Sequence, residues 1–416
     1  MSSEPPLSPD DLPAHLRDTY RILSAGTAQI LPSGGLAEKL LAADKEARPL
    51  RVKLGIDPSG SDLTLGHAVV LRKLRQFQDA GHLVVLIVGD FTGMVGDPSG
   101  RSQTRRLLTA ADTERNAATY VEQLMRILDP ARVELRRNSD WLATMSMADV
   151  IRESAHLTVA QLLERDDFAK RFAARQPISL VEFLYPLLQG YDSVAVEADI
   201  EIGGTDQTYN LLVGRDLQRA HGMPAQTVLT LPLLEGTDGV QKMGKSLNNW
   251  IGISEPANDQ FGKVMSIPDT LVGRYAALCT DLHPDEVAAL SADAATGGPA
   301  ANAAKRRVAR EIVALYHGAE AGTLAEGRFD AVFRRGAIPD DIPDHPLPAA
   351  DPVHVPALLV DLTFAPSASA ARRLIDQGAV RVNGTPLTRG EYDHPRAALT
   401  NAVLAAGKRR QARLTP

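Results

Sequence analysis

Cysteine is almost absent from this sequence, since Cys279 is the only one among 416 residues. A single thiol excludes an internal disulfide bond and any zinc site built from several cysteines. The 10 histidines are scattered, and the two closest in sequence, His345 and His354, lie in a proline-rich stretch. We therefore expect no metal site made of protein ligands.

Long hydrophobic runs are also missing. The longest strongly apolar run, Leu83–Val88, is far shorter than the roughly 20 residues that a membrane helix needs. The N-terminal segment is acidic and proline-rich, and it lacks the basic start and apolar stretch of a signal peptide. These absences predict a cytoplasmic protein with no membrane partner. The hydrophobic content of 44% and charged content of 23% are typical of a globular protein, and the length favours two or three domains.

The charge is unevenly distributed along the chain. The formal net charge is −6, but residues 357–416 carry nine Lys and Arg against four Asp and Glu, a net charge of +5. Residues 1–356 carry the remaining 36 basic and 47 acidic residues, a net charge of −11. The overall charge argues against a nucleic-acid partner, but a basic tail on an acidic body requires its own explanation.

The first half of the chain alternates apolar strands with helices. Residues 51–56 and 83–88 read as strands with a helix at about 66–80 between them, a β-α-β unit whose ligand site should lie at the carboxyl ends of the strands. Two further strands, at 199–202 and 227–231, are expected to flank a helix at 206–220. Other helices are expected at 110–128, 159–174 and 179–191, and the first fifty residues also read as helix.

The rest of the chain divides into smaller parts. Residues 256–335 read as mostly helical, and six prolines between residues 339 and 356 indicate a stiff linker. The expected fold class is therefore α/β: a Rossmann-type parallel sheet domain, then a helical domain and a small C-terminal α+β domain. The expected boundaries are 1–250, 251–338, a linker at 339–356, and 357–416.

Two glycine-rich loops carry groups that suit phosphate. Residues 55–67, GIDPSGSDLTLGH, close onto the start of a helix, where backbone N–H groups and the helix dipole favour an anion and His67 could donate to it. The alternative is a histidine that only caps or packs at the helix start. Residues 239–246, GVQKMGKS, place Lys242 and Lys245 on a loop that suits a transferring polyphosphate. Taken alone, this second segment could also be a solvated basic turn.

A polar stripe crosses an otherwise apolar helix. Tyr185, Gln189 and Asp192 lie at positions i, i+4 and i+7, so they share one helix face among leucines. Buried polar groups need partners, so three convergent groups suggest a small polar ligand, although an internal hydrogen-bonded network is the alternative. Residues 201–207, EIGGTDQ, repeat the strand-to-helix geometry that suits an anion or a polar ligand.

Taken together and in this order, the segments resemble the class I aminoacyl-tRNA synthetases, and within them the bacterial tyrosyl family. Residues 64–67 (TLGH) are similar to the HIGH signature of that class, and residues 242–246 (KMGKS) to its KMSKS loop. Residues 97–100 (DPSG), 203–207 (GGTDQ) and the helix with the polar stripe are similar to segments special to the tyrosyl branch. Residues 362–384 resemble the RNA-binding module named after a small-subunit ribosomal protein, which is the C-terminal domain of that family.

The resemblance implies a ligase that activates L-tyrosine with ATP and Mg²⁺ and transfers it to tRNA(Tyr). The first domain would be catalytic, the helical domain would lie on the anticodon side, and the chain would form a homodimer. The implied catalytic residues are His67, Lys242, Lys245 and Ser246. The implied tyrosine-binding residues are Asp97, Tyr185, Gln189, Asp192 and Gln207. The implied ATP-binding residues are Asp57, Ser59, Gly66, His67, Gly204, Asp206, Leu233 and Lys245, and the implied RNA-binding residues are Arg372, Arg373 and Arg381.

Two positions depart from the family pattern. Thr64 stands where the HIGH signature has its first histidine, which affects one phosphate contact. Lys53 stands where many tyrosyl enzymes have a tyrosine that donates to the substrate hydroxyl. A second subgroup of bacterial tyrosyl enzymes resembles this chain more closely, so we interpret Lys53 as a trait of that lineage.

Two alternative functions remain. A tryptophanyl synthetase shares the class I core, but it usually lacks the C-terminal module and the helix with the polar stripe. An RNA-binding protein could have kept this scaffold and lost catalysis. The intact lysine-rich loop favours an enzyme, together with Asp97, Asp192 and Gln207, because a pure binder need not keep them.

Overall fold

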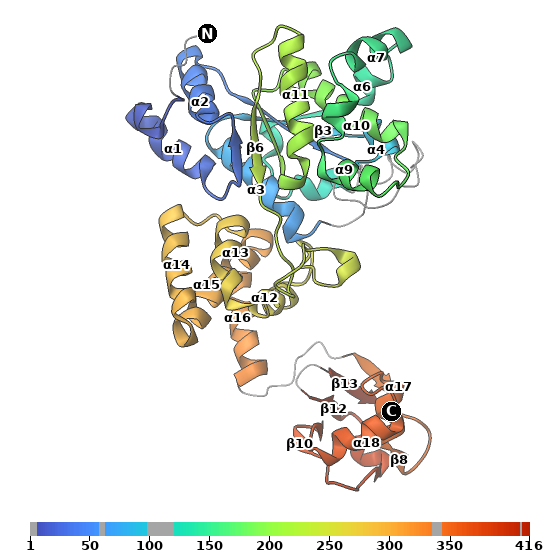
Figure 1. The fold of residues 1–416 in the computed structure, drawn as a ribbon. Coiled ribbons are helices and arrows are strands. Elements are labelled where there is room, and N and C mark those ends of the chain that lie inside the picture. The colour runs from blue at the N-terminus through green and yellow to red at the C-terminus, as the bar shows by residue number, and fades with distance from the viewer. Residues whose placement is uncertain (1–5, 58–62, 98–119, 335–342, 408–409) are drawn as a thin grey trace. The chain divides into compact units, whose positions relative to one another are not determined.

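The computed structural model describes residues 6–57, 63–97, 120–334, 343–407 and 410–416. The chain divides into two compact units, Met1–Thr323 and Leu324–Pro416, and each is considered by itself (Figure 1). Among the described residues, none of the helices combines the length and apolar content that crossing a bilayer requires.

A six-stranded sheet in the order β1-β6-β5-β2-β3-β4 forms the centre of the first unit. All neighbouring strands run parallel except β1 and β6. From β2 the chain winds through β3 and β4 toward one edge, and it then returns beside β2 to add β5 and β6 toward the other. Sheets of this kind bind ligands at such a reversal, beyond the carboxyl ends of the strands. The strands are β1 (Gln29–Leu31), β2 (Arg51–Ile56), β3 (Leu83–Val88), β4 (Val133–Arg137), β5 (Ile200–Gly204) and β6 (Thr227–Leu231).

Helices cover the sheet because its inner strands are mostly buried on both faces. Every residue of β6 is buried, as are five of the six in β3. Helix α3 packs against β3 and β5, and α11 packs against β5 and β6. The helices of this part are α1 (Ala14–Ser24), α2 (Gly35–Glu46), α3 (Leu65–Asp79), α4 (Thr92–Val95), α6 (Ser139–Leu142), α7 (Met147–Ser154), α8 (Val159–Leu162), α9 (Asp166–Ala173), α10 (Leu180–Ala195) and α11 (Thr208–Ala220).

Residues 257–334, which follow the sheet and the lysine-rich loop, are mostly helical. Helix α13 packs against α14 and α15, and α12 packs against α15. The helices here are α12 (Ala257–Met265), α13 (Val272–Cys279), α14 (Pro284–Thr296), α15 (Gly298–His317) and α16 (Ala319–Arg334).

The second unit is a small α+β fold. A five-stranded sheet in the order β10-β9-β12-β13-β7 and a two-stranded sheet of β8 and β11 surround a core to which α17 and α18 contribute. Strand β7 pairs with β13, so part of the stretch expected to be a linker belongs to this sheet. The elements are β7 (Asp344–Pro346), β8 (Val353–His354), α17 (Val355–Asp361), α18 (Ala368–Asp376), β9 (Val380–Val382), β10 (Thr385–Pro386), β11 (Asp393–His394), α19 (Arg396–Leu399), β12 (Val403–Ala406) and β13 (Arg410–Thr415).

The expected fold class is confirmed: a mostly parallel sheet with helices, a helical region and a small α+β domain. The expectation of helix throughout the first fifty residues was wrong, because Gln29–Leu31 forms the antiparallel edge strand. The helix expected at 159–174 is two short helices, α8 and α9, separated by residues 163–165. Of the helix expected at 110–128, residues 110–119 lie outside the described part and residues 120–124 are helical.

Glycine lets α10 and α11 approach closely. A Cβ atom added at Gly190 in α10 would lie 2.9 Å from Cγ1 of Val213 and 3.2 Å from the backbone nitrogen of Gly214, both in α11. The contact fixes the height of α10 above the sheet, and with it the height of the polar stripe.

We expect Gly190→Ala to lower the free energy of unfolding by about 1–3 kcal/mol, because overpacking forces neighbouring atoms apart. Gly262→Ala in α12 is the matched control, since its added Cβ atom meets nothing within 4 Å. The control should be neutral or gain up to about 1 kcal/mol, because alanine favours helix. Urea unfolding followed by tryptophan fluorescence measures both, and equal effects of the two substitutions would contradict the packing argument.

Candidate active site

Two cavities meet where the strand order reverses. The first has a volume of about 220 Å³ and the second about 270 Å³. They are adjoining chambers of one site, because six residues line both: Ile56, His67, Tyr120, Asp206, Gln207 and Lys242.

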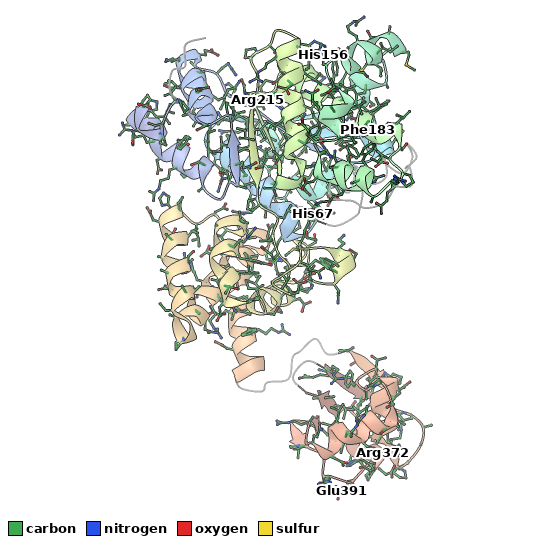
Figure 2. All side chains as sticks on the ribbon, in the orientation of Figure 1. His67, His156, Phe183, Arg215, Arg372 and Glu391 are labelled. Atoms are coloured by element: carbon green, nitrogen blue, oxygen red, sulfur yellow. The ribbon has the colours of Figure 1, made fainter. Side chains whose placement is uncertain are left out.

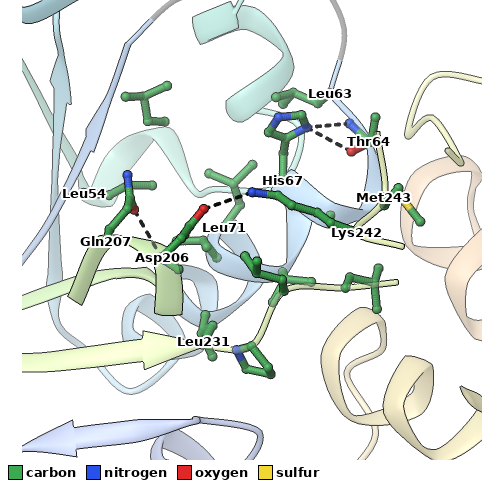
Figure 3. Close-up of a pocket in the computed structure, with 18 of the residues that line it drawn as sticks. Leu54, Leu63, Thr64, His67, Leu71, Asp206, Gln207, Leu231, Lys242 and Met243 are labelled. Carbon is green, nitrogen blue, oxygen red and sulfur yellow. Dashed lines mark hydrogen bonds and ion pairs between the residues drawn. The ribbon is translucent and has the colours of Figure 1, made fainter. Parts of the chain in front are cut away.

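The first chamber has mostly apolar walls and a polar end (Figure 3). Five residues expected to bind ATP line it: Gly66, His67, Gly204, Asp206 and Leu233. The absence of a side chain at Gly204 makes room for Asp206, since a Cβ atom there would lie 2.5 Å from Asp206 Oδ1. The apolar walls suit a flat aromatic ring. The carboxylate of Asp206 can accept from hydroxyl groups, and the N-terminus of α3 suits an anion.

His67 is held in one tautomer at the start of α3 (Figures 2 and 3). Its Nδ1 atom lies 3.2 Å from the backbone nitrogen of Thr64 and 2.9 Å from Thr64 Oγ1. A backbone N–H can only donate, so Nδ1 accepts and the proton of the neutral ring lies on Nε2. Burial, with the nearby charges of Lys245 and Lys242, lowers the pKa of His67 to about 4. At neutral pH the ring is therefore uncharged, and its Nε2–H is a hydrogen-bond donor. Thr64, which replaces a histidine of the signature, orients this ring.

The lysine-rich loop reaches the site through Lys242. Its Nζ atom lies 3.0 Å from Asp206 Oδ2, at the boundary of the two chambers. Lys245 and Ser246 belong to a short 3-10 helix, are exposed, and line neither chamber. Lys245 Nζ lies 5.7 Å from the centre of the Trp250 ring.

The second chamber gathers the residues expected to bind tyrosine. Asp97, Tyr185, Gln189, Asp192 and Gln207 line it together with Asp57, whereas Ser59 lies outside the described residues. The Tyr185 hydroxyl donates to Asp57 Oδ2 at 2.9 Å, and burial raises the Tyr185 pKa well above its ordinary value. Gln207 Nε2 lies 3.5 Å from Asp97 Oδ2. Tyr185 is thus already bonded within the protein, but all three residues of the polar stripe line the second chamber.

Asp192 is a buried carboxylate with two neutral donors. Trp141 Nε1 donates to its Oδ1 at 2.8 Å, and Asn138 Nδ2 donates to its Oδ2 at 3.2 Å. Only 2% of Asp192 is exposed, and this burial raises its pKa to about 7, against the lowering effects of Lys53 and the two donors. Neither donor was predicted from the sequence. Asn138 directly follows β4, where ligands of parallel sheets lie, but that strand was not predicted.

Lys53 lines neither chamber. Its Nζ atom lies 2.9 Å from Glu201 Oε1, 2.7 Å from Ser193 Oγ and 2.9 Å from the carbonyl oxygen of Gln189. Lys53 and Glu201 are almost fully buried. The pair ties α10 to strands β2 and β5 beneath the second chamber, so Lys53 supports the pocket rather than reading a ligand.

The three arginines expected to bind RNA lie in the second unit. Arg372 and Arg373 are on α18 and Arg381 is on β9, and all three are exposed. Arg372 is labelled in Figure 2. The guanidinium of Arg372 lies 5.6 Å from the centre of the Tyr392 ring.

Comparison with known families agrees with this architecture. The family described as tRNA synthetases class I (W and Y) matches residues 45–334, and the S4 domain matches residues 355–393. The chain is therefore a class I tRNA synthetase of the tryptophanyl and tyrosyl group, followed by an S4 domain.

Individual relatives separate the two branches of that group. The tyrosine–tRNA ligase of Moorella thermoacetica is 50% identical over 394 residues, 95% of each chain. That of Geobacter sulfurreducens is 49% identical over 399 residues, 96% of this chain and 98% of the relative. The chain belongs to the tyrosine–tRNA ligases.

Solved structures show the same fold at low identity. A tyrosyl-tRNA synthetase of Archaeoglobus fulgidus in complex with L-tyrosine superposes with a TM-score of 0.61 at 18% identity, covering 74% of this chain and 99% of that one. A C-terminally truncated mitochondrial tyrosyl-tRNA synthetase of Aspergillus nidulans gives a TM-score of 0.63 at 20% identity, covering 78% and 95%.

We expect Trp141 fluorescence to titrate with a midpoint of about 7. The carboxylate of Asp192 is ionised above that pH and accepts a charge-assisted bond from the indole, and protonation below it weakens the bond. The titration is measured in a Trp250→Phe background, where Trp141 is the only tryptophan. Asp192→Asn should abolish it, and a midpoint near 4, the ordinary range of an aspartate, would contradict the assignment.

Proposed function

We propose that tyrosine occupies the second chamber and ATP the first, and that the two react where the chambers meet. The observation that carries the proposal is Asp192, a buried acceptor at a cavity wall whose two neighbouring donors leave capacity for another hydrogen bond. The phenolic hydroxyl of tyrosine supplies such a donor. The tyrosine–tRNA ligase relatives support this choice of amino acid.

Each expected residue has a role in this arrangement. Asp192 accepts a hydrogen bond from the phenolic hydroxyl, and Gln207 lies near the tyrosine carboxylate. The ammonium group is held by the other three residues expected to bind tyrosine, which are Asp97, Tyr185 and Gln189. Gly66 and Leu233 pack against the nucleotide, with Gly204 beside them, and Asp206 binds the ribose.

Activation then needs no covalent enzyme intermediate. A carboxylate oxygen of tyrosine attacks the α-phosphorus of ATP in line, and the bond to pyrophosphate breaks. Asp57 lies near the α-phosphate, the neutral His67 donates from Nε2, and Lys242, Lys245 and Ser246 hold the departing pyrophosphate. The 2′-hydroxyl of the terminal adenosine of tRNA(Tyr) next attacks the adenylate carbonyl and releases AMP.

Mg²⁺ enters this site with the ATP phosphates. The described residues contain no group of three His, Cys, Asp or Glu side chains placed to hold a metal ion. Mg²⁺ commonly keeps several waters and binds through substrate phosphates with one or two carboxylates. In this proposal Asp57 would supply a protein carboxylate to Mg²⁺, and the dependence of activation on Mg²⁺ concentration tests the requirement.

The second unit serves tRNA in this proposal. Arg372, Arg373 and Arg381 are exposed on it, and the basic charge of residues 357–416 suits a phosphate backbone. A steep loss of tRNA affinity with rising salt, reduced when these arginines are replaced by glutamine, tests this role.

We also propose that two copies associate through an apolar surface of the first unit. Five large hydrophobic side chains there are 61–81% exposed: Met147, Ile151, Val159, Phe172 and Leu180. They lie on α7, α8, α9 and the start of α10, and α7 packs against α10. Exposed apolar patches mark interaction sites, and sedimentation of Ile151→Asp against the unaltered chain tests this one.

Asp192→Asn should reduce kcat/KM for tyrosine by about 10–100-fold at pH 8, because a charge-assisted hydrogen bond contributes roughly 1.5–3 kcal/mol. Any residual activity with phenylalanine should change far less, since phenylalanine brings no donor. Pyrophosphate exchange with both amino acids measures the two values in the unaltered and altered enzyme. An unchanged ratio would mean that the hydroxyl is recognised elsewhere.

Lys245→Ala should slow adenylate formation by about 100-fold or more, the scale of removing one preorganised donor from a developing charge. The dissociation constant of tyrosine should stay nearly constant, because Lys245 lines neither chamber. Single-turnover kinetics with separate titrations of tyrosine and ATP distinguish the two effects. Full-rate activation by the variant would remove Lys245 from the mechanism.

A further inference from the structure

Asn249 lies at the centre of the loop that carries the two lysines. Only 2% of it is exposed, whereas the side chains around it on residues 245–248 are exposed. Its Oδ1 accepts from the backbone nitrogen of Gly244 at 2.8 Å, and its Nδ2 donates to Asp238 Oδ2 at 2.7 Å. Nδ2 also lies 3.3 Å from the carbonyl oxygen of Lys242 and 3.4 Å from that of Gln241. One amide therefore joins both sides of the loop.

The surroundings of Asn249 leave little freedom for a different arrangement. Its own carbonyl accepts from the backbone nitrogen of Thr237 at 2.8 Å. A Cβ atom added at Gly236 would lie 2.2 Å from Asn249 Cγ, so only glycine permits this approach. Asp238 is fixed in turn, because its Oδ1 accepts from the backbone nitrogens of Val240 and Gln241 at 3.0 and 3.1 Å. The loop thus has a polar core built from Asn249 and Asp238.

This polar core controls the backbone from which the lysines project. The bonds of Asn249 reach the main chain of Lys242 and Gly244, which flank Met243. Met243 is buried and lines the first chamber, and Lys242 reaches Asp206 from the same segment. Catalytic groups act best when their orientation is fixed before the reaction, and a loose loop must be ordered at a cost each time ATP binds.

We propose that Asn249 is a positioning residue for adenylate formation, acting through the main chain of Lys242 and Gly244 to fix the backbone from which the lysines of the loop project. The inference rests on the proposed contact of that loop with pyrophosphate. Asn249 touches neither the tyrosine chamber nor the reacting atoms, so it differs in kind from Lys242 and Lys245.

Three variants of the full chain test the inference. Asn249→Ala removes every side-chain bond. Asn249→Asp keeps the shape and the acceptor for Gly244, but it sets two carboxylates against each other. Adding Asp238→Asn to Asn249→Asp restores a donor–acceptor pair with its direction reversed, so a rescue would identify this hydrogen bond as the cause.

We expect each single variant to lower the single-turnover rate of adenylate formation by about tenfold or more, since buried bonds to the loop are lost. The dissociation constant of tyrosine and the Tm should stay close to those of the unaltered enzyme. Trypsin should cut after Lys242 and Lys245 about tenfold faster, because cleavage follows the population of the open loop. The double variant should recover part of both effects, and Gly236→Ala should reproduce the defect of Asn249→Ala.

Unaltered rates and unaltered cleavage would overturn the inference. It would also be overturned by a loss of tyrosine affinity and Tm in proportion to the loss of rate, which indicates general destabilisation. Lys245→Ala is measured in parallel. If it activates tyrosine at full rate, the proposed function of the loop fails, and with it this inference. If it is slow while the Asn249 variants are fast, the role of Asn249 alone fails.

Discussion

The site is organised around the cost of burying one negative charge. An ionised carboxylate inside a protein is unfavourable unless hydrogen bonds or opposite charge replace its water. Asp192 receives an indole and an amide donor, from Trp141 and Asn138, and the charge of Lys53 beneath it further favours the ionised form. Helix α10, strand β4 and the segment after it must all be in place for these groups to converge. The setting of this carboxylate therefore depends on contacts between α10 and the segment that follows β4.

The buried ion pair of Lys53 and Glu201 helps to position the helix that carries Asp192. Lys53 and Glu201 stand opposite each other on β2 and β5, the two strands between which the strand order reverses. Where the strand order reverses, a crevice opens at the carboxyl ends of the strands, and ligands bind in it. The pair, with Ser193 and the carbonyl oxygen of Gln189, joins α10 to that part of the sheet by directional bonds. Directional bonds hold a helix at one height and rotation more strictly than apolar packing does.

Much of the fold could be predicted from the sequence because the inner strands and helices have strong periodicity. Leu83–Val88 is a continuous apolar run and Thr227–Leu231 is rich in β-branched residues, and both form strands with the expected bounds. The edge strands could not be found in this way. Val133–Arg137 reads VELRR, and its half-exposed residues give no buried-strand pattern.

The residues of the candidate site likewise divide into those that a sequence pattern reveals and those that it does not. Groups on recognisable loops and on the polar stripe, such as His67 and Asp192, were predicted, and the structure brings them to one pair of chambers. Asn138 was missed because the strand before it was missed. Trp141 is one of only two tryptophans, a signal that composition offers but cannot place. Asn249 could not be singled out, because its importance comes from four partners that lie on both sides of a folded loop.

The ion pair between Lys242 and Asp206 has a consequence for the order of events at the site. It is partly exposed, and pairs of that kind contribute only about 0–1 kcal/mol, so breaking it is easy. A ribose hydroxyl that takes over Asp206 would release the ammonium group of Lys242 at the boundary of the chambers, close to where the phosphates must lie. In the proposed arrangement, binding of the sugar would therefore free the Lys242 ammonium group to pair with the phosphates of the same nucleotide.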